Sequence, residues 1–138
     1  MSKLLTTIPQ QDDFYMPIES LSHRSTWMLW PRMKDNWHQN CKPARHTFAK
    51  IANTICKYEP VKMGVNKEDL PEARAMLDEK VELVEINYFD SWIRDMAPFY
   101  VINKAGQCRA VNFQFNGWGM KNMPIMNQPD FKWDYKVV

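Results

Sequence analysis

The sequence has few cysteines, and they form no recognisable set. Three occur in 138 residues, as Cys41, Cys56 and Cys108, and no C-x-x-C pair is present. An odd number of widely spaced thiols argues against a zinc site and against thioredoxin-like chemistry. We therefore expect free, buried thiols in a protein of a reducing compartment.

An excess of one charge and long apolar runs are also missing. Lys and Arg number 18 and Asp and Glu 16, so the net charge is 18 − 16 = +2, and no basic run concentrates it. This balance argues against nucleic acid or an anionic membrane surface as a partner. No apolar run approaches membrane-spanning length, and residues 1–13 lack the apolar core of a signal peptide. The expected location is cytoplasmic.

Signatures of a complete catalytic apparatus are absent as well. The sequence contains no P-loop, G-x-G-x-x-G or G-x-S-x-G motif. Cys56 is expected near the C-terminal end of a helix, an unfavourable place for a reactive thiolate, and Cys108 in a hairpin strand. His23, His38 and His46 lack metal-ligand spacing and are more typical of surface or packing positions. The residues indicate neither a metal site nor a nucleophile.

Short apolar runs alternate with helical patterns along most of the chain. Apolar residues from Ala44 to Ile55 recur at i, i+4, i+7, i+8 and i+11, and a weaker stripe runs from Leu70 to Leu77. The order β-α-β-α-β-β-β indicates one mixed α/β domain, with 1–13 as a loose lead-in and 122–138 as an irregular tail. Strands are predicted at 26–30, 61–65, 81–86, 99–102 and 110–115, the last two joined by a hairpin turn.

The segment Asp90-Ser91-Trp92-Ile93-Arg94-Asp95 interrupts this alternation with two carboxylates, a guanidinium and an indole. A carboxylate beside an aromatic face suits a flat cation, because the carboxylate accepts two parallel N–H bonds while the ring takes the π face. On a turn, Trp92 and Asp95 come together, and the following proline requires that turn to end before Ala97. We predict a guanidinium-binding site here; a structural ion pair of Arg94 and Asp95 is the alternative.

A second segment, Phe115-Asn116-Gly117-Trp118-Gly119, contains two of the four glycines of the chain. Glycine on both sides of Trp118 indicates a tight path where the backbone approaches something closely. A simple aromatic turn and a ligand-binding loop both fit this pattern.

These segments and several others, in this order, resemble the beginning of agmatine deiminases, which are related to bacterial peptidylarginine deiminases. The resemblance extends from about Tyr15 to about Asp134. No single motif is specific, whereas their order is. Besides the two segments above, the motifs are Met16-Pro17, the run from His23 to Pro31, Asp35-Asn36-Trp37, Lys42-Pro43-Ala44 and the run from Tyr58 to Val61.

The resemblance implies a pentein-type α/β propeller with mixed sheets, of which this chain would form about the first two of five modules and so be incomplete. It implies hydrolysis of agmatine to N-carbamoylputrescine and ammonia, a step toward putrescine, through a cysteine amidino-thioether and without metal or organic cofactor. Agmatine would be the small-molecule partner, and a homo-oligomer is compatible with the full-length form.

Five residues of the chain match the family's motifs near the active site. Asp95 corresponds to the carboxylate that holds the guanidinium, Trp92 to an aromatic wall of the pocket, and Trp118 to a residue near the site. Arg94 and Asp90 match the motif as structural residues near the site.

The family's nucleophilic Cys, its His and its Glu would all follow Val138, so the resemblance implies that about two-fifths of an enzyme is present and that these residues alone are inactive. Met96-Ala97 and Met120 depart from the family pattern. In the family, glycine is common at the positions of Ala97 and Met120. The alternative hypotheses are a catalytically inactive short paralogue or fragment that only binds guanidine-type cations or a homologous partner, and an α/β remnant whose charges are only structural.

Overall fold

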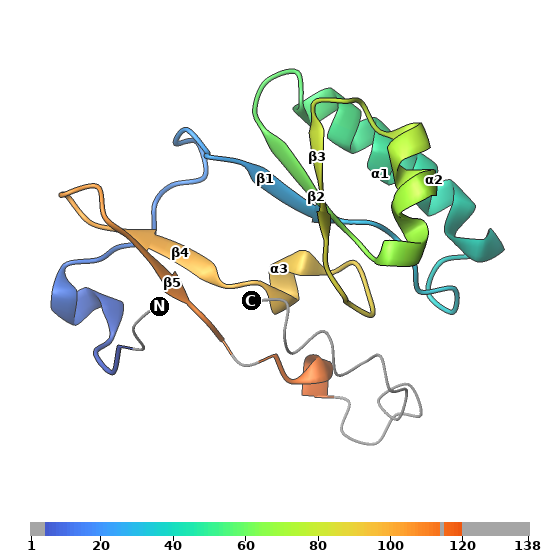
Figure 1. The fold of residues 1–138 in the computed structure, drawn as a ribbon. Coiled ribbons are helices and arrows are strands. Elements are labelled where there is room, and N and C mark those ends of the chain that lie inside the picture. The colour runs from blue at the N-terminus through green and yellow to red at the C-terminus, as the bar shows by residue number, and fades with distance from the viewer. Residues whose placement is uncertain (1–4, 114, 120–138) are drawn as a thin grey trace. The chain divides into compact units, whose positions relative to one another are not determined.

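The computed structural model describes residues 5–113 and 115–119 (Figure 1). The chain forms two units. One, the hairpin unit, consists of Met1–Ser22 and Pro98–Phe113, and the other, the sheet unit, of His23–Ala97 and Gln114–Val138. The predicted irregular tail, 122–138, lies outside the described residues.

The sheet unit is built on three parallel strands in the order β1-β2-β3 (Figure 1). They are β1 (Thr26–Leu29), β2 (Val61–Val65) and β3 (Val81–Glu85), joined by helices α1 (Lys42–Ile55) and α2 (Leu70–Met76). Because both crossovers are expected to be right-handed and both step in the same direction, the two helices lie on one face of the sheet. The strand and helix order predicted from the sequence is confirmed, with one addition, the short helix α3 (Ile93–Met96) after β3.

The core under the helices combines one side of each strand with small residues of α1 and α2. The register places Met28 beside Met63, and Met63 beside Leu83. The buried face of α1 is formed by Arg45, Ala49 and Ala52.

The apolar stripe predicted for α1 is therefore only partly correct, since Ile51 is 43% exposed. Arg45 takes a place on the buried face instead, where its Nε donates to the Pro31 carbonyl at 2.8 Å and its Nη2 contacts Asp69 at 2.8 Å.

A second core covers the other face of the sheet, since neighbouring residues of a strand point to opposite sides. Its buried members come from β1, from the loops after β1 and β3, from helix α3 and from the segment before the turn at Gly117–Gly119. Gly64 permits this packing, because a Cβ there would lie 2.5 Å from Leu29 Cδ2. The buried residues are Leu29, Met33, Tyr88, Phe89, Met96 and Phe115.

The hairpin unit contains the antiparallel strands β4 (Phe99–Ile102) and β5 (Cys108–Val111). The strand predicted at 110–115 thus begins and ends earlier. The turn explains the shift: Gly106 has φ 73°, and Asn103 N donates to the Gln107 carbonyl at 3.1 Å. Pairing therefore starts directly after the turn, at polar residues that an apolar pattern does not reveal.

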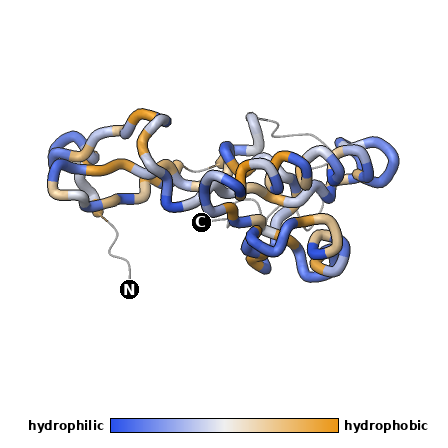
Figure 2. The backbone as a smooth tube through the Cα atoms, turned by 90° about the horizontal axis from the view of Figure 1, so that it is seen from above, coloured by the Kyte–Doolittle hydropathy of each residue, from blue (hydrophilic) through white to orange (hydrophobic). Residues whose placement is uncertain are grey.

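The lead-in of the hairpin unit includes a 3-10 turn at Pro9–Asp12. Tyr15 forms a β-bridge with Ile102, and the Arg109 guanidinium contacts the Asp12 carboxylate at 2.8 Å. In the hydropathy colouring of Figure 2, hydrophilic turns alternate with apolar segments along the chain. Within the described ranges, no helix has the length and apolar character needed to cross a membrane.

Candidate functional site

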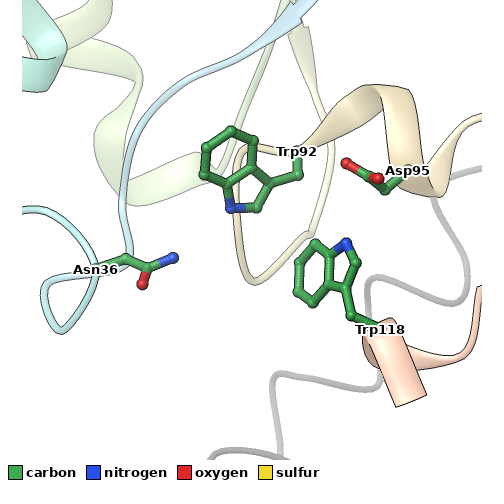
Figure 3. Close-up of a pocket in the computed structure, with 4 residues that line it drawn as sticks. All are labelled: Asn36, Trp92, Asp95 and Trp118. Carbon is green, nitrogen blue, oxygen red and sulfur yellow. The ribbon is translucent and has the colours of Figure 1, made fainter. Parts of the chain in front are cut away.

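The candidate site lies beyond the carboxyl ends of the parallel strands, where open α/β sheets commonly bind ligands. The loop after β1 contributes Asn36, and the segment after β3 contributes Trp92 and Asp95. With Trp118 they line an open cavity of about 390 Å³ (Figure 3). This volume is in the range of small-molecule sites.

Figure 3 shows Asn36 and Asp95 on opposite sides of the two indole rings of Trp92 and Trp118. The two tryptophans are half-exposed, at 42% and 45%. An organic cation entering this space would meet an aromatic face and a carboxylate together. The structure thus brings Trp92, Asp95 and Trp118 to one cavity, and their binding of a guanidinium stays a prediction.

Asp95 is placed by the short helix α3, which begins directly after Trp92. The Asp95 N–H donates to the Trp92 carbonyl at 3.1 Å, and the helix ends at Met96, before Ala97 as predicted. The Asp95 carboxylate is exposed and has no hydrogen-bond or ion-pair partner within residues 5–113 and 115–119. It is therefore available to a ligand, and in that part of the chain it does not pair with Arg94.

Asp90, the other carboxylate of the segment, has a different environment. It is 2% exposed, and its oxygens accept hydrogen bonds from Asn36 Nδ2 at 2.8 Å and from the Ser91 N–H at 2.7 Å. These bonds tie the loop after β1 to the loop after β3. Arg94 is exposed on α3 and does not line the cavity.

Trp92 is supported from behind by aromatic residues that the sequence analysis did not assign to the site. The Trp37 ring stacks on Trp92, with centroids 5.7 Å apart and an interplanar angle of 28°. Phe48 of α1 packs edge-on against Trp37 at 5.9 Å. The sequence signals were a tryptophan within an otherwise polar loop and the motif Asp35-Asn36-Trp37, to which no role was assigned.

Trp118 lies in the tight backbone path predicted from its flanking glycines. Gly117, Trp118 and Gly119 have φ values of 63°, 54° and 75°, all in the left-handed region. A Cβ on Gly119 would meet nothing within 4 Å, so the backbone conformation and not crowding favours glycine there. Phe115 packs edge-on against Trp118 at 4.9 Å and joins this turn to the second core.

The thiols do not form part of the cavity. Only Cys41 is buried; Cys56 is half-buried and Cys108 exposed, so the expectation of three buried thiols is wrong for Cys108. Burial raises the pKa of the Cys41 thiol, which disfavours a reactive thiolate. In the part of the chain that the structure describes, no group of three or more His, Cys, Asp or Glu residues could hold a metal ion.

Comparison with known proteins identifies the family. Residues 15–135 match the sequence profile of the Porphyromonas-type peptidyl-arginine deiminases. The chain belongs to this family. It is 44% identical over 119 residues to a putative agmatine deiminase of Mycoplasma capricolum, covering 86% of this chain and 33% of the relative. It is 43% identical over 119 residues to the agmatine deiminase of Stutzerimonas stutzeri, covering 86% of this chain and 32% of that one.

A solved structure of the agmatine deiminase of Enterococcus faecalis superimposes with a TM-score of 0.82 at 33% identity, covering 86% of this chain and 33% of the other. The predicted fold, α/β of pentein type, is confirmed by this likeness. The chain spans about a third of the length of the curated relatives it matches. This share is somewhat less than the two-fifths expected from the sequence.

Proposed function

We propose that this chain provides the guanidinium-binding wall of an enzyme that hydrolyses agmatine to N-carbamoylputrescine and ammonia. Membership of the family and the similarity to agmatine deiminases support the substrate. The observation that carries the proposal is the Asp95 carboxylate, which stands beside two indole rings without a partner among the described residues.

The proposed roles follow from the geometry of the cavity. Asp95 accepts two N–H bonds from the guanidinium, which fixes the plane of the cation. Trp92 and Trp118 offer π faces to that plane, which adds a cation–π interaction to the charge interaction with Asp95. Asp90 and Arg94 have structural roles in the same segment. The attack on the guanidinium carbon requires a cysteine and a histidine, and we expect both beyond Val138.

Binding without catalysis is the second candidate function. It is favoured by the same cavity, since the residues that line it in the described part of the chain are an asparagine, an aspartate and two tryptophans, with no thiol and no imidazole among them. A short paralogue of this kind would bind guanidine-type cations or a homologous partner.

Cytoplasmic location and a homo-oligomeric full-length form also stay predictions.

The test compares Asp95→Asn with Asp13→Asn in the intact gene product that carries this sequence. Asp13 is an exposed aspartate of the hairpin unit at φ 59°, a conformation that asparagine tolerates, so the two variants change the charge equally. Ammonia release from agmatine and the calorimetric Kd for agmatine are measured for both.

We expect Asp95→Asn to abolish turnover and weaken agmatine binding, and Asp13→Asn to leave both unchanged. Binding that depends on Asp95 without any ammonia release would favour the second candidate. If Asp95→Asn lowers only the thermal midpoint while agmatine still binds, the charge is structural and the proposal fails.

A further inference from the structure

Every polar atom of Tyr88, in its side chain and its backbone, forms a hydrogen bond. Its hydroxyl donates to the Trp30 carbonyl at 2.6 Å and lies 3.2 Å from the Gly64 carbonyl. Its backbone carbonyl accepts from Arg32 Nη1 at 2.8 Å. Burial raises the pKa of the phenol, so the hydroxyl stays a donor. The residue is 0% exposed and fixes the path of the chain shortly before the cavity.

Asn66 completes this set from the end of β2. Its Nδ2 donates to the Tyr88 carbonyl at 3.2 Å, and the Tyr88 N–H donates to its Oδ1 at 3.4 Å. The neighbouring backbone bond of the β2–β3 pair runs from Ile86 N to the Val65 carbonyl at 3.0 Å. The Asn66 amide therefore continues the pairing by a side chain, at the point where the two strands separate.

The segment secured in this way leads directly to the cation cavity. Asp90 follows Tyr88 by two residues and Trp92 by four, and helix α3 with Asp95 begins directly after Trp92. We infer that Asn66 is a positioning residue of the cation site, acting through Tyr88 to orient Trp92 and Asp95. This inference rests on the function proposed for the cavity.

A buried amide can also serve stability alone, and the chain contains an internal comparison. Asn53 of α1 brackets another turn in the same manner: its Nδ2 donates to the Met76 carbonyl at 3.0 Å and its Oδ1 accepts from the Asp78 N–H at 2.8 Å. This turn connects α2 to β3, at the opposite end of β3 from the cavity. The two asparagines thus offer the same chemistry, of which only Asn66 secures the segment entering the site.

The experiment uses Asn66→Ala and Asn53→Ala in the intact gene product, with Asn66→Ser as a milder variant in case Asn66→Ala does not fold. Three quantities are measured: the urea midpoint, the calorimetric Kd for agmatine, and amide hydrogen exchange of residues 88–92. We expect both alanine variants to lower the midpoint. Only the changes at Asn66 should weaken agmatine binding and speed exchange in that segment, each roughly tenfold for alanine and less for serine.

Equal effects of the Asn53 and Asn66 variants on the Kd and on exchange would overturn the inference, because Asn66 would then act through general stability. A failure of the proposed function would give a different result: the protein without any substitution would not bind agmatine. Exchange of residues 88–92 still decides in that case whether Asn66 holds the segment.

Discussion

The indole ring of Trp92 rests on that of Trp37, with the ring centroids 5.7 Å apart. One face of Trp92 is thereby occupied, so a cation can approach only the side that lines the cavity. Stacked aromatic pairs are worth roughly 0.5–1.5 kcal/mol beyond the area they bury. The contact makes the orientation of Trp92 dependent on the loop after β1.

Replacement of this support should therefore weaken ligand binding without removing a ligand contact. For Trp37→Leu we expect agmatine to bind about 1 kcal/mol more weakly, roughly fivefold in Kd, while Trp37→Phe retains most of the affinity. Calorimetry measures the effect. Trp27→Leu is the control, since Trp27 is 39% exposed on β1 and does not line the cavity. Equal losses in the Trp37 and Trp27 variants would contradict this role.

The left-handed turn around Trp118 allows a second matched comparison. Gly119 and Gly106 have φ values of 75° and 73°, and a Cβ on either would meet nothing within 4 Å. Alanine at either position should therefore lower the free energy of unfolding by about 1–2 kcal/mol, because a residue with a Cβ disfavours the left-handed backbone conformation. We expect only Gly119→Ala to weaken agmatine binding, because only that turn carries a residue lining the cavity. Unfolding midpoints and agmatine Kd values are measured together, and unchanged binding in Gly119→Ala would separate the turn from the site.

Local sequence patterns predicted the secondary structure correctly where the apolar residues of an element are also its buried residues. The run Val61–Val65 was predicted and found with the same ends, because alternating apolar residues suffice to define a buried strand. Tertiary contacts decided the remainder. The inward turn of Arg45 depends on acids 24 and 27 residues away, and no pattern in α1 reveals it.

The site shows the same division. Sequence reasoning located the segment that ends in Asp95, because charged and aromatic residues there interrupt an apolar pattern. It could not determine which of the two carboxylates is buried, since one partner of Asp90 is Asn36, which lies 54 residues earlier. The importance of Tyr88 was equally hidden, because its hydroxyl bonds to a carbonyl 58 residues away.

The buried ion pair of Arg45 and Asp69 should be a main determinant of stability in the sheet unit. Their side chains are 11% and 14% exposed, with Nη2 and Oδ1 2.8 Å apart, and Nη1 also pairs with Glu72. Arg45→Met keeps much of the packing but leaves Asp69, in a poorly solvated place, with the longer contact to Arg32 Nε at 3.8 Å. We therefore expect a loss of about 3 kcal/mol in the free energy of unfolding, at the low end for a broken buried pair.

The control for this prediction is the pair Lys62–Glu82, 3.1 Å apart, whose side chains are 33% and 57% exposed. Lys62→Met should change the free energy of unfolding by less than about 1 kcal/mol. Urea denaturation measures both variants. A loss in Arg45→Met no larger than that in Lys62→Met would show that the pair contributes specificity of packing and little stability.

The thiols differ in exposure, and their reaction with iodoacetamide should follow that difference. Cys108 is exposed and should react first, whereas Cys41 is buried and should react only when the chain opens.

Burial raises the pKa of the Cys41 thiol in the folded state, so this thiol ionises at lower pH in the unfolded chain. Folding stability should therefore fall above about pH 8.5, and Cys41→Ala should reduce that fall. Mass spectrometry of the labelled protein and urea midpoints at pH 7 and pH 9.5 test both parts. Fast labelling of Cys41 under native conditions, or an unchanged pH dependence in Cys41→Ala, would show that this thiol is solvated.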